Sequence, residues 1–495
     1  MQWPRASGIL VHPTSFPGRF GVGDLGPGAR ATLDFLERAG QKLWQILPLG
    51  PTGYGNSPYA LLSAFAGNPL LISPEVLLEE GLLAASDLEG APAGREDRVD
   101  FGAMIAWKAR LLRVSYARFE RLAAPALRAE YAAFCAAQAA WLDEFALFFA
   151  LKELHAGVAW TQWAAPYAQR DPAALAAART ALANEIDLQR YAQFLFYRQW
   201  DALRAQARRR GVAIIGDLAI FVAHDSADVW ANQRLFKLDR HGEPLAVAGV
   251  PPDYFSPTGQ RWGNPLYRWD RLAADGYAWW IARVRQTLEL ADIIRLDHFR
   301  GFEACWEIPG HNPTAANGRW VAGPGAALFE AIQDALGEAP FIAEDLGVIT
   351  PAVDELRERC GFPSMRVMQF GFEDGPASPH LPHHVSAATA LYTGTHDNDT
   401  SAGWFAALKA PQRAYTLRYL AADAAQVPLA MIRAAQASVA PIVIAPLQDA
   451  LGLGSEARMN LPARADGNWE WRCPQRLLTA EVASQLAQFA ALYDR

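Results

Sequence analysis

Eight short apolar segments recur along this chain of 495 residues, and each is followed by polar or turn-forming residues. Runs of this length that are rich in Val, Ile, Leu and aromatic residues predict buried β-strands. The eight predicted strands lie at residues 8–12, 43–49, 212–222, 292–299, 340–346, 365–372, 389–395 and 440–447.

Helical patterns separate most of these strands. Residues 27–40 place apolar side chains on one side and end at Gly40, as expected where a helix terminates. Further helices are predicted at 184–210, 325–336 and 350–359, the last with Thr350 as its N-cap. Strands that alternate with helices favour a parallel sheet, and eight such units predict an α/β fold of the (β/α)8, or TIM barrel, type.

Two connections are too long for a simple barrel. Residues 65–210 are mostly Ala-rich helix, and residues 224–280 are rich in loops, Trp and Pro. We interpret both as insertions on the C-terminal face of a single catalytic barrel that spans residues 1–495. No run of strands follows the eighth one, so a C-terminal β-domain is not expected.

Composition excludes several classes of protein. The net charge of −7 provides no basic surface for nucleic acid. The N-terminus has no apolar core of a signal peptide, and apolar stretches such as 145–151 are too short to span a bilayer. We therefore expect a cytoplasmic protein that binds neither nucleic acid nor membrane. Its cysteines have no CxxC spacing and are expected to be reduced thiols: Cys135, Cys305, Cys360 and Cys473.

The fourth predicted strand, DIIRLDHF, ends in ionisable residues. Burying such groups is costly unless they are paired, and alternation along a strand places Arg295 and Asp297 on one face, with His298 on the other. A guanidinium at this spacing would keep the carboxylate ionised and lower its pKa. Strands five and seven end in Glu344 and Asp397, so three carboxylates are predicted at the C-terminal mouth of the barrel, where TIM-barrel active sites lie.

Three carboxylates at one barrel mouth are typical of glycosidic chemistry. A retaining mechanism needs an ionised nucleophile and a protonated acid, and the apolar approach to Glu344 would raise its pKa toward the acid role. Any one of these residues could instead cap a helix or form an ion pair. A catalytic metal is not expected, because the first strand ends in a single His and not in HxH, and no nucleotide-binding or nucleophile-elbow motif occurs, so no cofactor is expected.

Several long motifs resemble those of 4-α-glucanotransferases, the amylomaltases or disproportionating enzymes of the α-amylase clan. They include GILVHPTSFPG, LWQILPLGPTGYGNSPY, GDLAIFV, AGVPPDYFSPTGQRWGNPLYRW, DIIRLDHFRGF, FIAEDLGVIT, YTGTHDNDT and RMNLP, and they run from about residue 8 to 472. The resemblance implies that Asp297 is the nucleophile, Glu344 the general acid/base and Asp397 the transition-state stabiliser. It implies substrate-binding roles for Tyr59, Asp217, Arg295, His298, His396, Gln260, Trp262, Tyr254, Phe255, Asp374 and Asn460.

The implied reaction transfers a segment of an α-1,4-glucan to the 4-hydroxyl of an acceptor glucan or glucose. The expected partners are donor and acceptor maltooligosaccharides or amylose, and the expected assembly is a monomer or a small homo-oligomer. An α-amylase-like hydrolase on the same barrel is the alternative, and a glycan-binding protein without activity is a third reading. Retention of all three carboxylates argues against the third.

Overall fold

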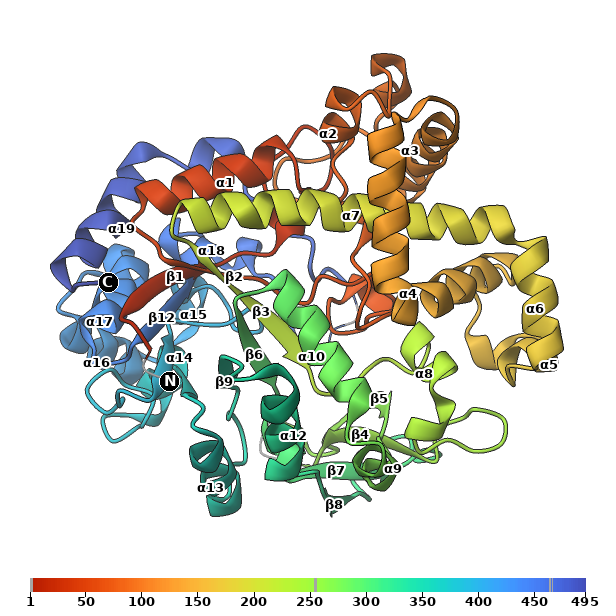
Figure 1. Cartoon of the computed structure of the whole chain (residues 1–495). Helices are drawn as coiled ribbons and strands as arrows, with labels where there is room; N and C mark the ends of the chain where they lie inside the picture. Colours follow the sequence, from red (N-terminus) through yellow and green to blue (C-terminus); the bar gives the residue numbers. More distant parts are fainter. Residues whose placement is uncertain (1–2, 253–255, 463, 465) are drawn as a thin grey trace.

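A closed barrel of eight parallel strands forms the centre of the molecule (Figure 1). The computed structural model describes residues 3–252, 256–462, 464 and 466–495. Around the barrel the strands follow the order β1, β12, β11, β10, β9, β6, β3, β2. Their bounds are β1 Ala6–Leu10, β2 Leu43–Gln45, β3 Ala213–Ala219, β6 Ile293–Asp297, β9 Phe341–Ala343, β10 Ser364–Val367, β11 Thr389–Tyr392 and β12 Ile442–Pro446. Six of them lie within the predicted segments, β1 and β10 overlap theirs but begin one or two residues earlier, and the predicted fold class is confirmed.

The barrel closes where the first strand pairs with the last. Gly8 of β1 lies opposite Ile444 of β12 on one side and Leu43 of β2 on the other. A Cβ atom on Gly8 would lie 2.4 Å from the Cβ and carbonyl oxygen of Leu43. Only glycine fits this position, because any side chain would push β1 and β2 apart.

One predicted strand is partly wrong. Residues 365–372 were expected to be a single strand, but β10 ends at Val367 and Met368–Asp374 form the helix α14. This stretch is apolar throughout, and periodicity alone does not separate a buried strand from a short buried helix. Met368 and Phe372, one helical turn apart, are both buried in the core, which favours the helix.

Helices cover the outside of the barrel between successive strands. The predicted helix at 27–40 is α1, which ends at Arg38, and Gly40 follows with φ of +65°. Thr350 occupies the N-cap of α13 as predicted, but its side chain makes no capping hydrogen bond. Before β9 these helices include α1 Pro27–Arg38 and α12 Ala326–Leu336. The helices that follow β9 are α13 Pro351–Cys360, α14 Met368–Asp374, α15 Ser401–Ala407, α16 Ala410–Leu420, α17 Val427–Ala437, α18 Leu447–Ala450 and α19 Ala480–Leu492.

The connection between β2 and β3 is helical, as expected, and Figure 1 shows it extending from the barrel on the side away from the C-terminal helices. Its helices are α2 Pro74–Glu79, α3 Phe101–Leu122, α4 Pro125–Leu154, α5 Ala165–Ala168, α6 Pro172–Ala181 and α7 Ala183–Arg209. Among the described residues, α4 is the one helix long and apolar enough to cross a membrane by length and composition, which the short run at 145–151 did not indicate. Leu142, Phe145 and Phe148 of this helix are buried in the protein core, as in a core helix of a globular protein.

The connection after β3 contains strands that were not predicted. Residues 224–280 were expected to be loop-rich, but β4 and β5 form there and join β7 and β8 in a separate four-stranded sheet, at the bottom of Figure 1. The sheet is antiparallel, and two of its strands precede β6 in the sequence while two follow it. No local pattern in 224–280 could therefore reveal how these strands pair. The elements are β4 Ala246–Val250, β5 Gln260–Pro265, β7 Ala304–Pro309, β8 Arg319–Ala322, α8 Ala227–Ala231, α9 Trp269–Ala274, α10 Ala278–Leu290 and α11 Arg300–Glu303.

Candidate active site

Asp297 is the last residue of β6, at the C-terminal mouth of the barrel. Arg295, two residues earlier on the same face, contacts it with 3.0 Å between Nη2 and Asp297 Oδ1. Nη1 of Arg295 also donates to both carboxylate oxygens of Asp217 on the neighbouring strand β3, at 2.9 and 2.7 Å. One buried guanidinium therefore bridges two carboxylates and fixes the orientation of the more exposed one, Asp297.

The Asp217 carboxylate has a second partner, the hydroxyl of Tyr59. The Asp217 side chain is fully buried, and its Oδ2 accepts a hydrogen bond of 2.7 Å from the Tyr59 hydroxyl. Burial raises the pKa of Asp217, while Arg295 opposes that rise. The Tyr59 ring stacks on the His396 ring with 5.1 Å between centroids. Direct contacts therefore connect four of the predicted residues, Tyr59, Asp217, Arg295 and His396.

Glu344 follows the end of β9, the strand next to β6. Leu296 pairs with Ala343 across the two strands, so the residues that follow, Asp297 and Glu344, leave the sheet side by side. Burial and the nearby Asp297 charge raise the pKa of Glu344 to about 7, against the effect of Arg295 and two backbone N–H groups. Those N–H groups belong to His298, at 2.7 Å from Oε2, and to Leu346, at 3.0 Å from Oε1.

Asp397 lies in the loop after β11, and its side chain is half exposed. Its Oδ1 accepts a 2.6 Å hydrogen bond from Nδ2 of Asn460 and lies 3.4 Å from Nε2 of His396. Arg458 donates to the backbone carbonyl of Asp397 at 2.6 Å. Asn460 is thus brought to the third carboxylate itself, and the loop is fixed by the segment after β12.

Strict alternation predicted that the side chains of His298 and Asp297 point to opposite faces of the strand, and this prediction is wrong. His298 lines the same groove as Asp297, because β6 ends at Asp297 and the backbone of His298 takes a left-handed conformation with φ of +53°. Burial lowers the pKa of His298 to about 4, so the ring is neutral at physiological pH. Trp262 of β5 packs edge-on against this ring at 4.8 Å.

A groove of about 690 Å³ runs along this side of the site. Asp297, His298, Tyr59 and Trp262 line it, and its volume lies within the range of pockets that bind small molecules. The Trp262 indole is 39% exposed, and its Nε1 donates to Oε1 of Gln260 at 3.2 Å, so both predicted residues of the GQRWGNP motif lie beside the groove.

The predicted residue Asp374 follows the barrel strand β10 at the end of the helix α14. Asp374 is exposed at the end of α14, and its side chain accepts a 3.3 Å hydrogen bond from Ser378. Among the described residues, no hydrogen bond or ion pair joins Asp374, the last residue of α14, to Asp297, Glu344 or Asp397. Tyr254 and Phe255 lie outside the described residues.

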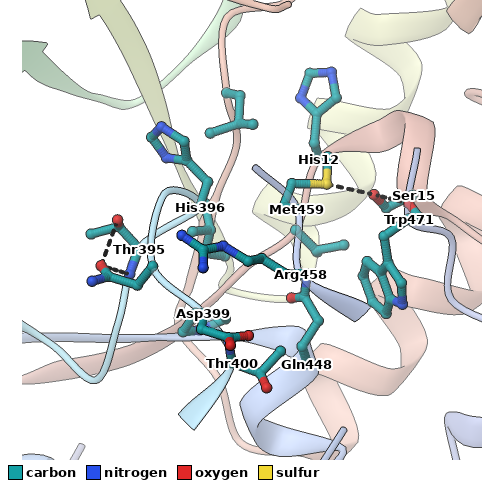
Figure 2. Close-up of a pocket in the computed structure, with 15 residues that line it drawn as sticks. His12, Ser15, Thr395, His396, Asp399, Thr400, Gln448, Arg458, Met459 and Trp471 are labelled. Atoms are coloured by element: carbon teal, nitrogen blue, oxygen red, sulfur yellow. Dashed lines mark hydrogen bonds between the residues drawn. The ribbon is translucent and has the colours of Figure 1, made fainter. Parts of the chain in front are cut away.

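The structure also adds residues that the motifs did not single out. The Trp469 ring packs against the rings of Tyr59 and His396, at 6.0 and 5.8 Å. Arg458 stands in the RMNLP motif beside Asn460 and could have been found there, whereas Trp469 lies in a loop without a recognisable pattern. His396 also lines a small cavity, together with His12 and Arg458 (Figure 2). Within the described part of the chain, no group of three or more His, Cys, Asp or Glu residues is arranged as metal ligands.

The arrangement supplies what glycosyl transfer with a covalent intermediate requires. Asp297 is oriented by a guanidinium, Glu344 has a pKa near neutrality and is suited to give and take a proton, and Asp397 offers a third carboxylate. Aromatic rings and buried polar side chains beside these groups suit the faces and hydroxyls of sugars.

Comparison with known proteins agrees with this chemistry. The family model described as 4-α-glucanotransferase matches residues 11–479. A 4-α-glucanotransferase of Thermus thermophilus is 50% identical over 503 aligned residues that cover 100% of both chains, and one of Solanum tuberosum is 44% identical over 99% of this chain and 86% of its own. An amylomaltase from Streptococcus agalactiae, solved in complex with acarbose, is 38% identical, covers 99% of both chains and superposes with a TM-score of 0.96.

An amylomaltase from Corynebacterium glutamicum, 20% identical, shares the fold with a TM-score of 0.80 over 98% of this chain and 75% of its own. The family match spans nearly the whole barrel, and the Thermus thermophilus and Streptococcus agalactiae relatives are similar over 99–100% of their length. The chain belongs to the 4-α-glucanotransferase family.

Proposed function

We propose that the enzyme acts by a retaining double displacement in which Asp297, Glu344 and Asp397 are the catalytic residues. In the first half-reaction Asp297 attacks the anomeric carbon of a glucosyl unit while Glu344 protonates the departing 4-oxygen of the shorter fragment. The products of this step are the released fragment and a β-linked glycosyl-enzyme ester. The single observation that carries the assignment is the adjacency of Asp297 and Glu344 at the ends of paired strands.

In the second half-reaction Glu344, now ionised, removes the proton from the 4-hydroxyl of an acceptor glucan. That oxygen attacks the anomeric carbon, the ester bond to Asp297 breaks, and the α-1,4 linkage is restored. A pKa of about 7 suits a group that must be an acid in one step and a base in the next. Asp397, held by Asn460, stabilises the positive charge that develops on the sugar ring.

The remaining predicted residues bind the substrate in this proposal. Tyr59, stacked on His396, provides a surface for the glucosyl unit at the cleavage point, and Asp217 and His298 accept or donate hydrogen bonds to its hydroxyls. Trp262 and Gln260 bind the acceptor, for which the groove that runs past Asp297 offers room. An acceptor bound there, together with the 250–256 segment that carries Tyr254 and Phe255, would exclude water from the intermediate and favour transfer over hydrolysis.

The partners are donor and acceptor α-1,4-glucans, including maltooligosaccharides, amylose and glucose, and no metal or other cofactor takes part. We further propose a cytoplasmic enzyme, a monomer or small homo-oligomer, that binds neither nucleic acid nor membrane. The whole chain acts as one catalytic unit with insertions at about 65–210 and 224–280. The closure of the barrel by its first and last strands supports this reading.

Maltotriose as the only substrate tests the reaction. The transferase yields glucose together with a ladder of longer oligosaccharides, while the number of reducing ends stays constant because each bond broken is replaced. Chromatography of the products and a reducing-end assay give both readings from one reaction. A steady rise in reducing ends with shorter products alone would establish the hydrolase alternative instead.

A further inference from the structure

A small cavity lies behind the Asp397 loop and has a volume of about 30 Å³ (Figure 2). This is room for about one water molecule. The cavity is lined by Leu47 after β2 and by residues at the ends of β1, β11 and β12 or in the loops that follow them, so it joins segments that are far apart in the sequence. Two of its lining residues, His12 and His396, carry imidazole rings, and in Figure 2 both rings project to the same side of the view.

Most polar side chains around this cavity are already engaged in hydrogen bonds. The Ser15 hydroxyl donates to the Trp471 carbonyl at 2.8 Å, and Gln448 donates to the Ala457 carbonyl at 3.2 Å. Four further hydrogen bonds join residues of the same loop or of two neighbouring loops. Thr395 donates to Asn398 at 2.8 Å, Ser455 to Asp399 at 2.7 Å, the Gly403 N–H to Thr400 at 3.1 Å, and Arg458 to the Asn460 carbonyl at 2.7 Å.

The two imidazoles differ from this pattern. His12 is 6% exposed, and its Nδ1 is buried with no hydrogen-bond partner among the described residues. The His396 ring is 7% exposed and stacks on Tyr59. Its one polar contact within the residues that the structure describes is the 3.4 Å approach of Nε2 to Oδ1 of Asp397. An unpaired buried nitrogen costs about 1–3 kcal/mol, so a His at position 12 is poorly explained by packing alone.

Electrostatics link the two rings. Burial lowers the pKa of His12 to about 3, together with a smaller effect in the same direction from the neighbouring His396. His12 is therefore neutral throughout the physiological range, with one nitrogen that donates and one that accepts. The tautomer and orientation of an active-site His are set by the group bound to its second nitrogen.

We propose that His12 is a positioning residue for His396, and that it acts across the small cavity through one water molecule. By fixing the ring and tautomer of His396, it fixes the surface that meets Tyr59 and the nitrogen that faces Asp397. His12 touches neither the substrate nor the reacting atoms in this account. The inference deepens the proposed function, on which it rests.

The test replaces His12 by Phe, which fills a similar volume without polar nitrogens, and by Gln, which keeps a donor and an acceptor. Disproportionation of maltotriose by His12→Phe should show kcat reduced at least tenfold with KM changed less than threefold, and His12→Gln should recover kcat to within about threefold of wild type. Acarbose, used as an inhibitor, should bind more weakly to His12→Phe than to His12→Gln.

His155 provides the matched control. It is a partly buried His whose ring stacks on Trp163 at 5.3 Å in the helical insertion, so Phe and Gln at position 155 should give equal kcat. Thermal unfolding of all variants separates stability from positioning. Equal losses in His12→Phe and His12→Gln, or wild-type kcat in His12→Phe, would overturn the proposal. A wild-type enzyme that fails to disproportionate maltotriose would instead overturn the proposed function.

Discussion

The Glu344 carboxyl makes a prediction about stability that is separate from activity. Its pKa rises from an ordinary 4.5 to about 7 in the folded protein, mainly because it is buried. The folded state therefore holds this proton more tightly than the unfolded state does. Between about pH 4.5 and pH 7 the folded state binds more protons, so the free energy of unfolding must fall as pH rises across this interval.

The shift sets the magnitude. A difference of about 2.5 pH units at 1.36 kcal/mol per unit corresponds to a loss of roughly 3 kcal/mol between pH 4.5 and pH 8. Glu344→Gln has no proton to lose, so it escapes this loss. Gln also forfeits one of the two hydrogen bonds from the His298 and Leu346 N–H groups, but that cost is the same at both pH values and cancels from the comparison.

Urea unfolding of both proteins at pH 4.5 and pH 8 provides the measurement. On raising the pH, wild type should lose roughly 3 kcal/mol more than Glu344→Gln, while the variant loses nearly all activity at every pH because it cannot protonate the leaving oxygen. Parallel stability curves would show that Glu344 is not buried in the way described.

Three further predictions concern single contacts. Asp297→Asn should lower kcat on maltotriose at least a thousandfold, or about 4 kcal/mol of activation free energy, with little change in melting temperature; near-normal turnover would remove Asp297 from the nucleophile role. Asn460→Ala should lower kcat about tenfold or more, because Asp397 loses a charge-assisted hydrogen bond, and KM should change less. Lys108→Met should cost about 3–5 kcal/mol in urea unfolding, since it leaves Asp24 unpaired in the interior, and adding Asp24→Asn should recover part of that loss.

The sequence predicted the barrel because its strands are buried on both faces and read as continuous apolar runs. The same property caused the error at 365–372, where the apolar run continues through β10 into α14. The second sheet was missed for a different reason. Its strand β4 pairs with β7, which lies beyond β6 in the sequence, and such distant pairing leaves no local signal.

The site was predicted more fully than the contacts that hold it. The sequence predicted that Asp297, Glu344 and Asp397 follow barrel strands, as they do in the structure, but alternation placed His298 on the wrong face, because a left-handed residue at a strand end breaks the period of two. The double role of Arg295 also could not be read from one strand. It depends on the register that brings Asp217 opposite it.

Covalent labelling tests the central claim most directly. A maltotriosyl fluoride that lacks its terminal 4-hydroxyl cannot act as an acceptor, and fluoride leaves without help from an acid. In Glu344→Gln the second half-reaction is slow because no base activates the acceptor, so the glycosyl-enzyme should accumulate. Mass spectrometry of the digested protein should find one maltotriosyl adduct, on the peptide that contains Asp297. An adduct on another carboxylate, or release of fluoride without any adduct, would contradict the account.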